Sequence, residues 1–142
     1  MRFKDYFSLK HIIFAVVLIG LMMLFAVNQS NNTVKVKFQE NAVRITSSQY
    51  SMTIDYTDIV SVKQESLADA GEKVENGYDD DILRAGKWKN ETWGEYHVCA
   101  DLDVKKCIVV TLDDGSVFVF SRKSDKETAS IYNELLTHLP TA

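Results

Sequence analysis

Apolar residues are distributed unevenly along this 142-residue chain. Sixteen consecutive uncharged residues, IIFAVVLIGLMMLFAV, occupy residues 12–27, and shorter apolar runs alternating with polar residues follow after residue 33. As a helix, the long run covers about 24 Å, against about 30 Å for the hydrocarbon core of a bilayer. Leu9 and a snorkelling Lys10 would complete the length. The pattern predicts a transmembrane helix over residues 12–28, preceded by a basic and aromatic segment at residues 1–11.

Two alternatives to an uncleaved anchor are a cleaved signal peptide and a buried core helix. The end of the run makes a poor cleavage site, and no cysteine follows it to carry a lipid. Basic residues are slightly more frequent before the run (Arg2, Lys4, Lys10) than after it (Lys35, Lys37). The positive-inside rule then favours a single-pass cell-membrane protein with a cytoplasmic N-terminus and an extracytoplasmic C-terminal domain; the mirror orientation is the alternative.

Strand-like alternation begins after a polar tether at residues 29–33. Seven short strands are predicted, at residues 34–38, 43–45, 50–54, 59–62, 92–100, 106–112 and 117–121. Residues 65–81 carry seven acids against one base and are predicted to form the long loop. The Asp-Asp-Gly-Ser stretch at residues 113–116 predicts a hairpin turn between the last two strands.

The chain ends in a predicted amphipathic helix. Ser124 with Glu127 three residues later forms a capping box, and an apolar stripe of helical spacing runs from Ile131 to Leu139 before Pro140 stops it. The predicted fold class is therefore α+β, mainly β: a transmembrane helix, then a seven-stranded antiparallel barrel capped by one C-terminal helix, with the domain over residues 34–139.

Three stretches carry a more specific pattern: TDIVSVK at residues 57–63, ILRAGKWKNETWGEY at 82–96, and VVTLDDGSVFVFS at 109–121, followed by YNELL. With the order of seven strands and one helix, they resemble the bacterial pleckstrin-homology (PH) domains found in small membrane-anchored proteins of Gram-positive bacteria. In that family an arginine and a glycine precede a second glycine and an aromatic residue. The matching positions here are Arg84, Gly86, Gly94 and Tyr96, and the resemblance implies a PH-like barrel.

Catalytic chemistry receives no support from the residue pattern. His11, His97 and His138 share no ligand spacing, and no nucleophile motif, P-loop or dinucleotide turn occurs. The acidic run could suggest calcium, but it lacks the ordered spacing of a calcium loop, which favours a solvated loop. The sequence predicts no enzyme, with no catalytic residue, metal or cofactor.

The two cysteines and a cluster of large side chains are the remaining candidates. If the strands at 92–100 and 106–112 form a hairpin in which Cys99 faces Cys107, a disulfide is possible outside the cell; two free thiols are the alternative. Arg84, Trp88 and Trp93 could form a ligand or partner patch, or could cover the barrel mouth.

Charge narrows the class of partner. After Asn28 there are thirteen basic and nineteen acidic side chains, so the net charge of this part is about −6. Such a domain is expected to bind neither nucleic acid nor phosphoinositides. The leading hypothesis is a membrane-anchored, non-enzymatic PH-like interaction module that pairs with a protein or peptide at a sheet edge or beside the helix. The alternatives are a membrane-complex subunit or regulator acting through its transmembrane helix, and a small-ligand sensor using Arg84, Trp88 and Trp93.

Overall fold

A computed structural model describes residues 3–31 and 34–140, and its contacts divide the chain into two compact units at residue 31. The first unit is one helix, α1 (Phe3–Asn31). Residues 29–31, predicted as tether, continue this helix, and residues 32 and 33 of that tether lie outside the described residues.

The prediction of a membrane anchor is wrong. Within residues 3–31 and 34–140, no helix is long and apolar enough to cross a bilayer. The uninterrupted apolar run of α1 is shorter than the about 20 residues that a span requires. Three further predictions are withdrawn with it: the transmembrane helix, the single-pass location in the cell membrane and the extracytoplasmic placement of the domain. The alternative of a regulator acting through that helix is withdrawn as well.

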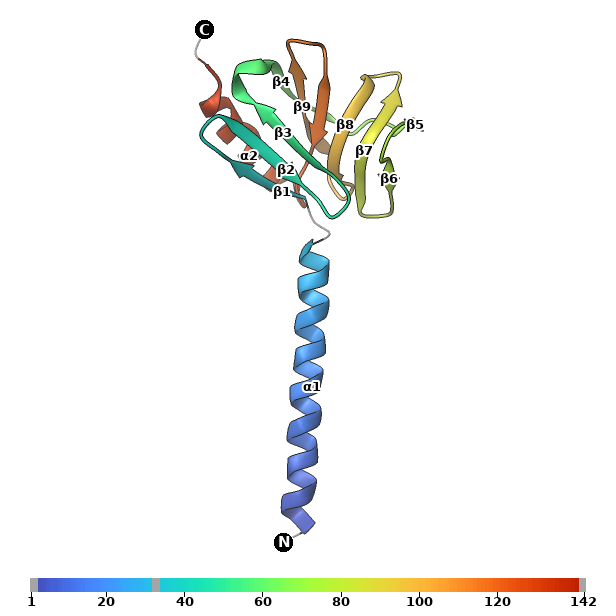
Figure 1. The fold of residues 1–142 in the computed structure, drawn as a ribbon, viewed down its shortest axis with the longest axis vertical. Helices are drawn as coiled ribbons and strands as arrows, with labels where there is room; N and C mark the ends of the chain where they lie inside the picture. The colour runs from blue at the N-terminus through green and yellow to red at the C-terminus, as the bar shows by residue number, and fades with distance from the viewer. Residues whose placement is uncertain (1–2, 32–33, 141–142) are drawn as a thin grey trace. The chain divides into compact units, whose positions relative to one another are not determined.

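The second unit is α+β and mainly β, with two sheets and one helix (Figure 1). Sheet A is an antiparallel meander of β1 (Lys35–Phe38), β2 (Ala42–Thr46) and β3 (Ser51–Asp55). A 3-10 turn, η1 (Tyr56–Asp58), leads into sheet B, whose strands are β4 (Ile59–Ser66), β5 (Glu72–Lys73), β6 (Tyr78–Asp79), β7 (Leu83–Asn90), β8 (Gly94–Asp101), β9 (Lys106–Leu112) and β10 (Val117–Phe120). The last element is α2 (Asp125–His138).

The strand order of sheet B contradicts the predicted antiparallel barrel. The order is β4-β9-β10-β8-β7-β5, with β6 also paired to β7, and β10 runs parallel to β8. β10 is inserted between β8 and β9, so these two strands form no hairpin. Two short strands, β5 and β6, occupy the segment predicted as a continuous loop.

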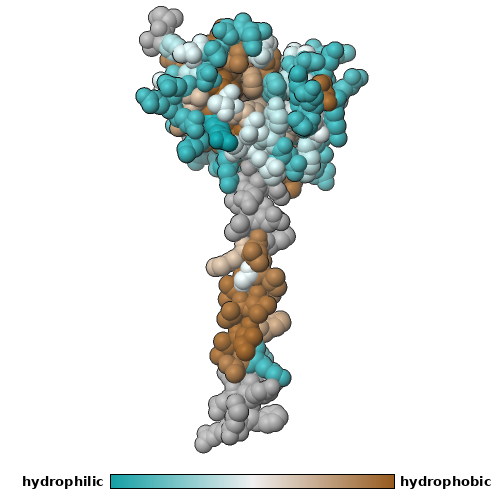
Figure 2. Space-filling model, viewed as in Figure 1, coloured by the Kyte–Doolittle hydropathy of each residue, from teal (hydrophilic) through white to brown (hydrophobic). Residues whose placement is uncertain are grey.

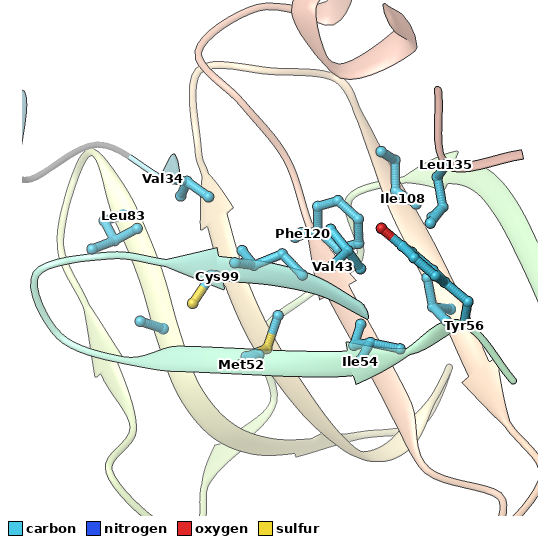
Figure 3. Packing of buried hydrophobic residues seen from close by; sticks show 13 residues of the cluster. Val34, Val43, Met52, Ile54, Tyr56, Leu83, Cys99, Ile108, Phe120 and Leu135 are labelled. Atoms are coloured by element: carbon cyan, nitrogen blue, oxygen red, sulfur yellow. The ribbon is translucent and has the colours of Figure 1, made fainter. Parts of the chain in front are cut away.

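The main core lies between sheet A, α2 and one face of sheet B. Val43, Met52 and Ile54 of sheet A face Cys99 and Phe120 of sheet B (Figure 3). Leu135 closes the same cluster from α2, which packs on β9 and β4. Most outward alternate residues of β1 to β3 are exposed, as expected of a sheet with one buried face; Ala42 is buried and Thr46 is partly exposed.

A second core lies on the other face of sheet B. Trp88, Tyr96, Val98, Cys107 and Val109 are buried there. Residues 67–71, here named the strap, connect β4 to β5 at the opposite edge of the sheet, and Leu67 and Ala70 of the strap pack against this cluster. Sheet B is therefore apolar on both faces, which explains the nearly continuous apolar sequence of β9.

Candidate functional site

The free edge of sheet B is formed by β4, an eight-residue strand. The strap residue Leu67 donates its backbone N–H to the carbonyl of Lys105, which makes their position a hydrogen-bonded pair of the β4–β9 ladder. Hydrogen-bonded pairs alternate along an antiparallel ladder, so Lys63 bonds to β9 while the backbone of Val62 and Gln64 points away from it. Among the described residues, β4 pairs with no strand other than β9. This edge presents unsatisfied backbone donors and acceptors.

Helix α2 lies beside that edge in a defined orientation. Ser124 caps it by accepting from the Glu127 N–H, at 3.1 Å, which confirms the serine part of the predicted capping box. At the helix start the Asp125 carboxylate accepts from the backbone N–H groups of Lys105 and Lys106. At the helix end the His138 ring stacks on Phe38, with 4.9 Å between centroids. Both ends of α2 are thereby fixed on the domain.

One flank of α2 faces sheet A and the other faces away from it. Glu127 lies 3.9 Å from Arg122, and His138 stacks on Phe38 and Tyr56, so this flank points toward β1. At 3.6 residues per turn, the opposite flank carries Ala129, Tyr132 and Leu136. Since α2 rests on β9 and β4, this apolar flank borders the free edge of β4.

Two exposed apolar side chains lie near the beginning of β4 and the end of α2. Val60 sits at the irregularity of the β4–β9 register and is 65% exposed, and Leu136 is 42% exposed. Tyr56, the first residue of the η1 turn that leads into β4, stacks on His138 at the end of α2. The beginning of β4 and the end of α2 therefore lie together. We name the free edge of β4 with the flank Ala129, Tyr132 and Leu136 the β4–α2 groove.

The predicted patch of Arg84, Trp88 and Trp93 lies instead under and beside the strap. The Arg84 Nη1 donates to the Ala68 carbonyl at 2.9 Å, and its buried Nε lies 3.8 Å from the Asp79 carboxylate with no hydrogen bond. Trp88 is buried and donates to the Ala85 carbonyl. Trp93 donates to the Glu65 carboxylate at 3.0 Å. These three side chains make structural contacts in the second core.

The four positions that match the PH-like motif are partly brought together. The Tyr96 hydroxyl donates to the Ala70 carbonyl of the strap at 2.7 Å, next to the Arg84 contact with Ala68. Burial raises the pKa of Tyr96, so its hydroxyl remains a donor. Gly86 and Gly94 have positive φ values, of 91° and 68°. Arg84 and Tyr96 thus hold the strap. Gly86 and Gly94 allow the backbone of β7 and β8 to adopt positive φ values at these two positions.

The predicted facing of Cys99 and Cys107 is wrong, because β10 separates their strands. Cys99 pairs with Ala85 and Phe120, and Cys107 pairs with Glu65. The thiols are free and belong to different clusters, on opposite faces of sheet B. Burial raises the pKa of each thiol to about 12, so neither is a thiolate near neutral pH.

A hollow of about 700 Å³ opens beside the strap. It is lined by Asp69, Gly71, Glu72, Lys89, Asn90, Glu91 and Thr92. The predicted patch residues Arg84, Trp88 and Trp93 do not line it. Throughout the described part of the chain, no three His, Cys, Asp or Glu side chains converge as metal ligands do.

A histidine lies between the sheets at another point. The His97 Nδ1 lies 2.9 Å from the Tyr50 hydroxyl, and its ring stacks on Phe118 with 4.7 Å between centroids. Burial first, and then the charge of Lys87, lower the pKa of His97. His97 is therefore a neutral packing residue at pH 7.

Sequence reasoning predicted binding at a sheet edge or beside the helix but did not locate that edge on β4. It ended the fourth strand at residue 62, four residues before β4 ends. The alternation of Val62, Gln64 and Ser66 with Lys63 and Glu65 was too weakly apolar to extend the strand. Comparison with known proteins adds no name: no family model, curated protein or solved structure matches this chain.

Proposed function

We propose that the domain is a non-enzymatic interaction module that binds an extended segment of a protein partner in the β4–α2 groove. The observation that carries this proposal is the eight-residue edge strand β4, whose outward backbone is unpaired beside an apolar helix flank. A partner strand adding to β4 would satisfy the backbone of Val62 and Gln64, and its apolar side chains would cover Tyr132 and Leu136. The resemblance to bacterial PH domains remains a prediction, and the proposed groove does not depend on it.

The chemistry of the buried groups supports a binding role over a catalytic one. The strongest potential nucleophiles, Cys99 and Cys107, are fully buried with pKa values of about 12. The groove is bordered by backbone groups and apolar side chains, which suit recognition of an extended chain.

Proline substitution tests the groove, because the two sides of β4 respond differently. Gln64→Pro removes an N–H that points away from β9, whereas Lys63→Pro removes one that bonds to it. We expect Gln64→Pro to leave the domain folded and Lys63→Pro to lower the free energy of unfolding by about 1–3 kcal/mol. Thermal unfolding followed by circular dichroism measures both.

Peptide selection then tests binding. A phage-displayed library of random peptides is panned against the full chain, and the selected peptides are measured against Gln64→Pro and Leu136→Asp. Binding that weakens about tenfold or more in both variants, with backbone amide shifts at Val62 and Gln64, supports the groove. Recovery of no peptide, or of peptides that bind folded Gln64→Pro as tightly as the unchanged chain, contradicts the proposal.

A further inference from the structure

Sheet A carries a concentration of positive charge on its outer face. Val36 and Phe38 pack into the main core, so the alternate residues Lys35 and Lys37 point outward, and both are exposed. Arg44, also exposed, lies directly opposite Lys37 in the β1–β2 register. We name Lys35, Lys37 and Arg44 the cationic face.

The spacing of the three cations follows from the ladder. Gln39 donates its N–H to the Ala42 carbonyl, so the Lys37–Arg44 position two residues further along is also hydrogen-bonded, with about 5.5 Å between Cα atoms. Lys35 precedes Lys37 by two residues on the same strand, about 7 Å away. Like charges placed directly opposite each other destabilise a sheet. Within residues 34–140, none of the three cations makes an ion pair.

The surroundings of the cationic face favour a short acidic ligand. Thr53 lies opposite Arg44 and Thr46 lies opposite Lys35, so hydroxyl groups flank the cations. Asp55, on the same face of the sheet, lies opposite Ala42 and forms no ion pair with the described cations. The domain as a whole is acidic, and residues 72–81 are rich in exposed acids. The net negative charge of the domain therefore disfavours a long polyanion or an anionic bilayer, whereas a short acidic segment needs only the three local cations.

We propose that the cationic face is a second docking surface, which binds a short acidic protein segment in extended conformation. Carboxylates at alternate positions of an extended chain recur at about 7 Å, which matches the spacing of Lys35 and Lys37. Arg44 adds a guanidinium that can bind a carboxylate through two parallel hydrogen bonds. This surface is distinct from the β4–α2 groove and does not depend on it.

The test uses the full chain and a dye-labelled octapeptide of alternating Glu and Thr, measured by fluorescence anisotropy. The double variant Lys37→Thr with Arg44→Thr is compared with Lys123→Thr with Lys126→Thr, which removes the same charge from exposed lysines near the start of α2. We expect binding to weaken about tenfold or more in the first variant and to change little in the second. Raising the salt from about 50 mM to about 300 mM should weaken binding by the unchanged chain.

Several results would overturn the proposal. Equal loss in both double variants would mean that net charge alone attracts the peptide. Equal affinity for a peptide with four Glu followed by four Thr would show that the face does not recognise carboxylates at alternate positions.

Tighter binding of a single-stranded DNA or of anionic vesicles through the same residues would assign the face to another partner class. Salt-sensitive self-association in sedimentation velocity, lost in the face variant while the peptide fails to bind, would assign it to a second copy. Because Lys37→Thr with Arg44→Thr removes a like-charge pair, its melting temperature should not fall, which keeps loss of binding separate from unfolding.

Discussion

Gly86 is a residue at which the backbone of β7 passes close to a neighbouring loop. Its φ is 91°, and a Cβ placed there would lie 2.0 Å from the Asn76 carbonyl oxygen. Gly94, at the start of β8, also has a positive φ, of 68°, but a Cβ there would meet nothing within 4 Å. Both glycines require a positive φ, but only Gly86 also lacks room for a Cβ, so comparing the two distinguishes the cost of the backbone conformation from the cost of a steric clash.

Alanine at these two positions should have unequal costs. Gly94→Ala pays only for the left-handed conformation, about 1–2 kcal/mol of the free energy of unfolding. Gly86→Ala adds a clash with backbone atoms that no side-chain rotation relieves, and we expect a total of about 2–5 kcal/mol. Urea denaturation of both variants measures the difference. Equal destabilisation would show that the segment around Asn76 moves aside freely.

At this scale the sequence predicted features whose partners are local. The Ser124 cap could be predicted, because its partner Glu127 lies within one turn. The Asn76 partner of Gly86 could not be predicted, because that contact depends on a loop ten residues away. Cys99 and Cys107 were misplaced for the same reason: their neighbours are set by strand order, which residue types do not encode.

The strap is the least regular element, and side chains of sheet B hold it. The carbonyls of Ala68, Asp69 and Ala70 accept in turn from Arg84, Asn90 and Tyr96. These three consecutive carbonyls are therefore held by hydrogen bonds from side chains and not by the backbone hydrogen bonds of a strand pair. Because the strap packs on the second core, which contains Cys107, we expect these bonds to limit solvent access to that thiol.

Opening of the strap can be measured by thiol labelling. Tyr96→Phe removes the bond to the Ala70 carbonyl, worth about 1 kcal/mol, so labelling of Cys107 by a maleimide should accelerate about fivefold. Cys99, in the main core, should label no faster.

Tyr56→Phe is the matched control, because it removes a bond from a tyrosine hydroxyl to the Gln39 carbonyl in the main core. It should leave Cys107 labelling unchanged. Parallel acceleration of Cys99 and Cys107 in Tyr96→Phe would mean that labelling occurs through global unfolding, and that the strap does not open separately.

Among the elements, several strand positions were predictable from alternation, whereas β5, β6, β7 and the partners of the strands in sheet B were not. Alternation located the strands of sheet A, whose short connections, of three and four residues, make neighbours of consecutive strands. The run from Cys107 to Val110 is buried at every position, and such a run indicates a strand covered on both faces. It does not say which strands lie beside it, and the parallel insertion of β10 next to β8 had no local signal. The position of β4 at the edge beside α2 depends on that strand order, so the predicted edge could not be assigned to a strand.

At the scale of the whole molecule, the two units differ in what they expose. The described apolar side chains of α1 between Leu9 and Leu24 are about half exposed or more, and they form the continuous brown surface of Figure 2. The second unit has a predominantly polar surface in the same view, with its apolar residues gathered in the two clusters. Every residue of both clusters lies between Val34 and Leu135.

The domain should therefore fold without α1. A chain that begins at Asn32 retains both cores, the strap and the capped helix α2, and we expect its melting temperature to lie within about 3 °C of the value for the full chain. It should also bind the peptides selected for the β4–α2 groove with unchanged affinity, because every residue of that groove lies after residue 58. Calorimetry and anisotropy measure the two quantities. A large fall in melting temperature would mean that α1 contributes to the stability of the domain, and unchanged stability with lost peptide binding would place part of the binding surface on α1.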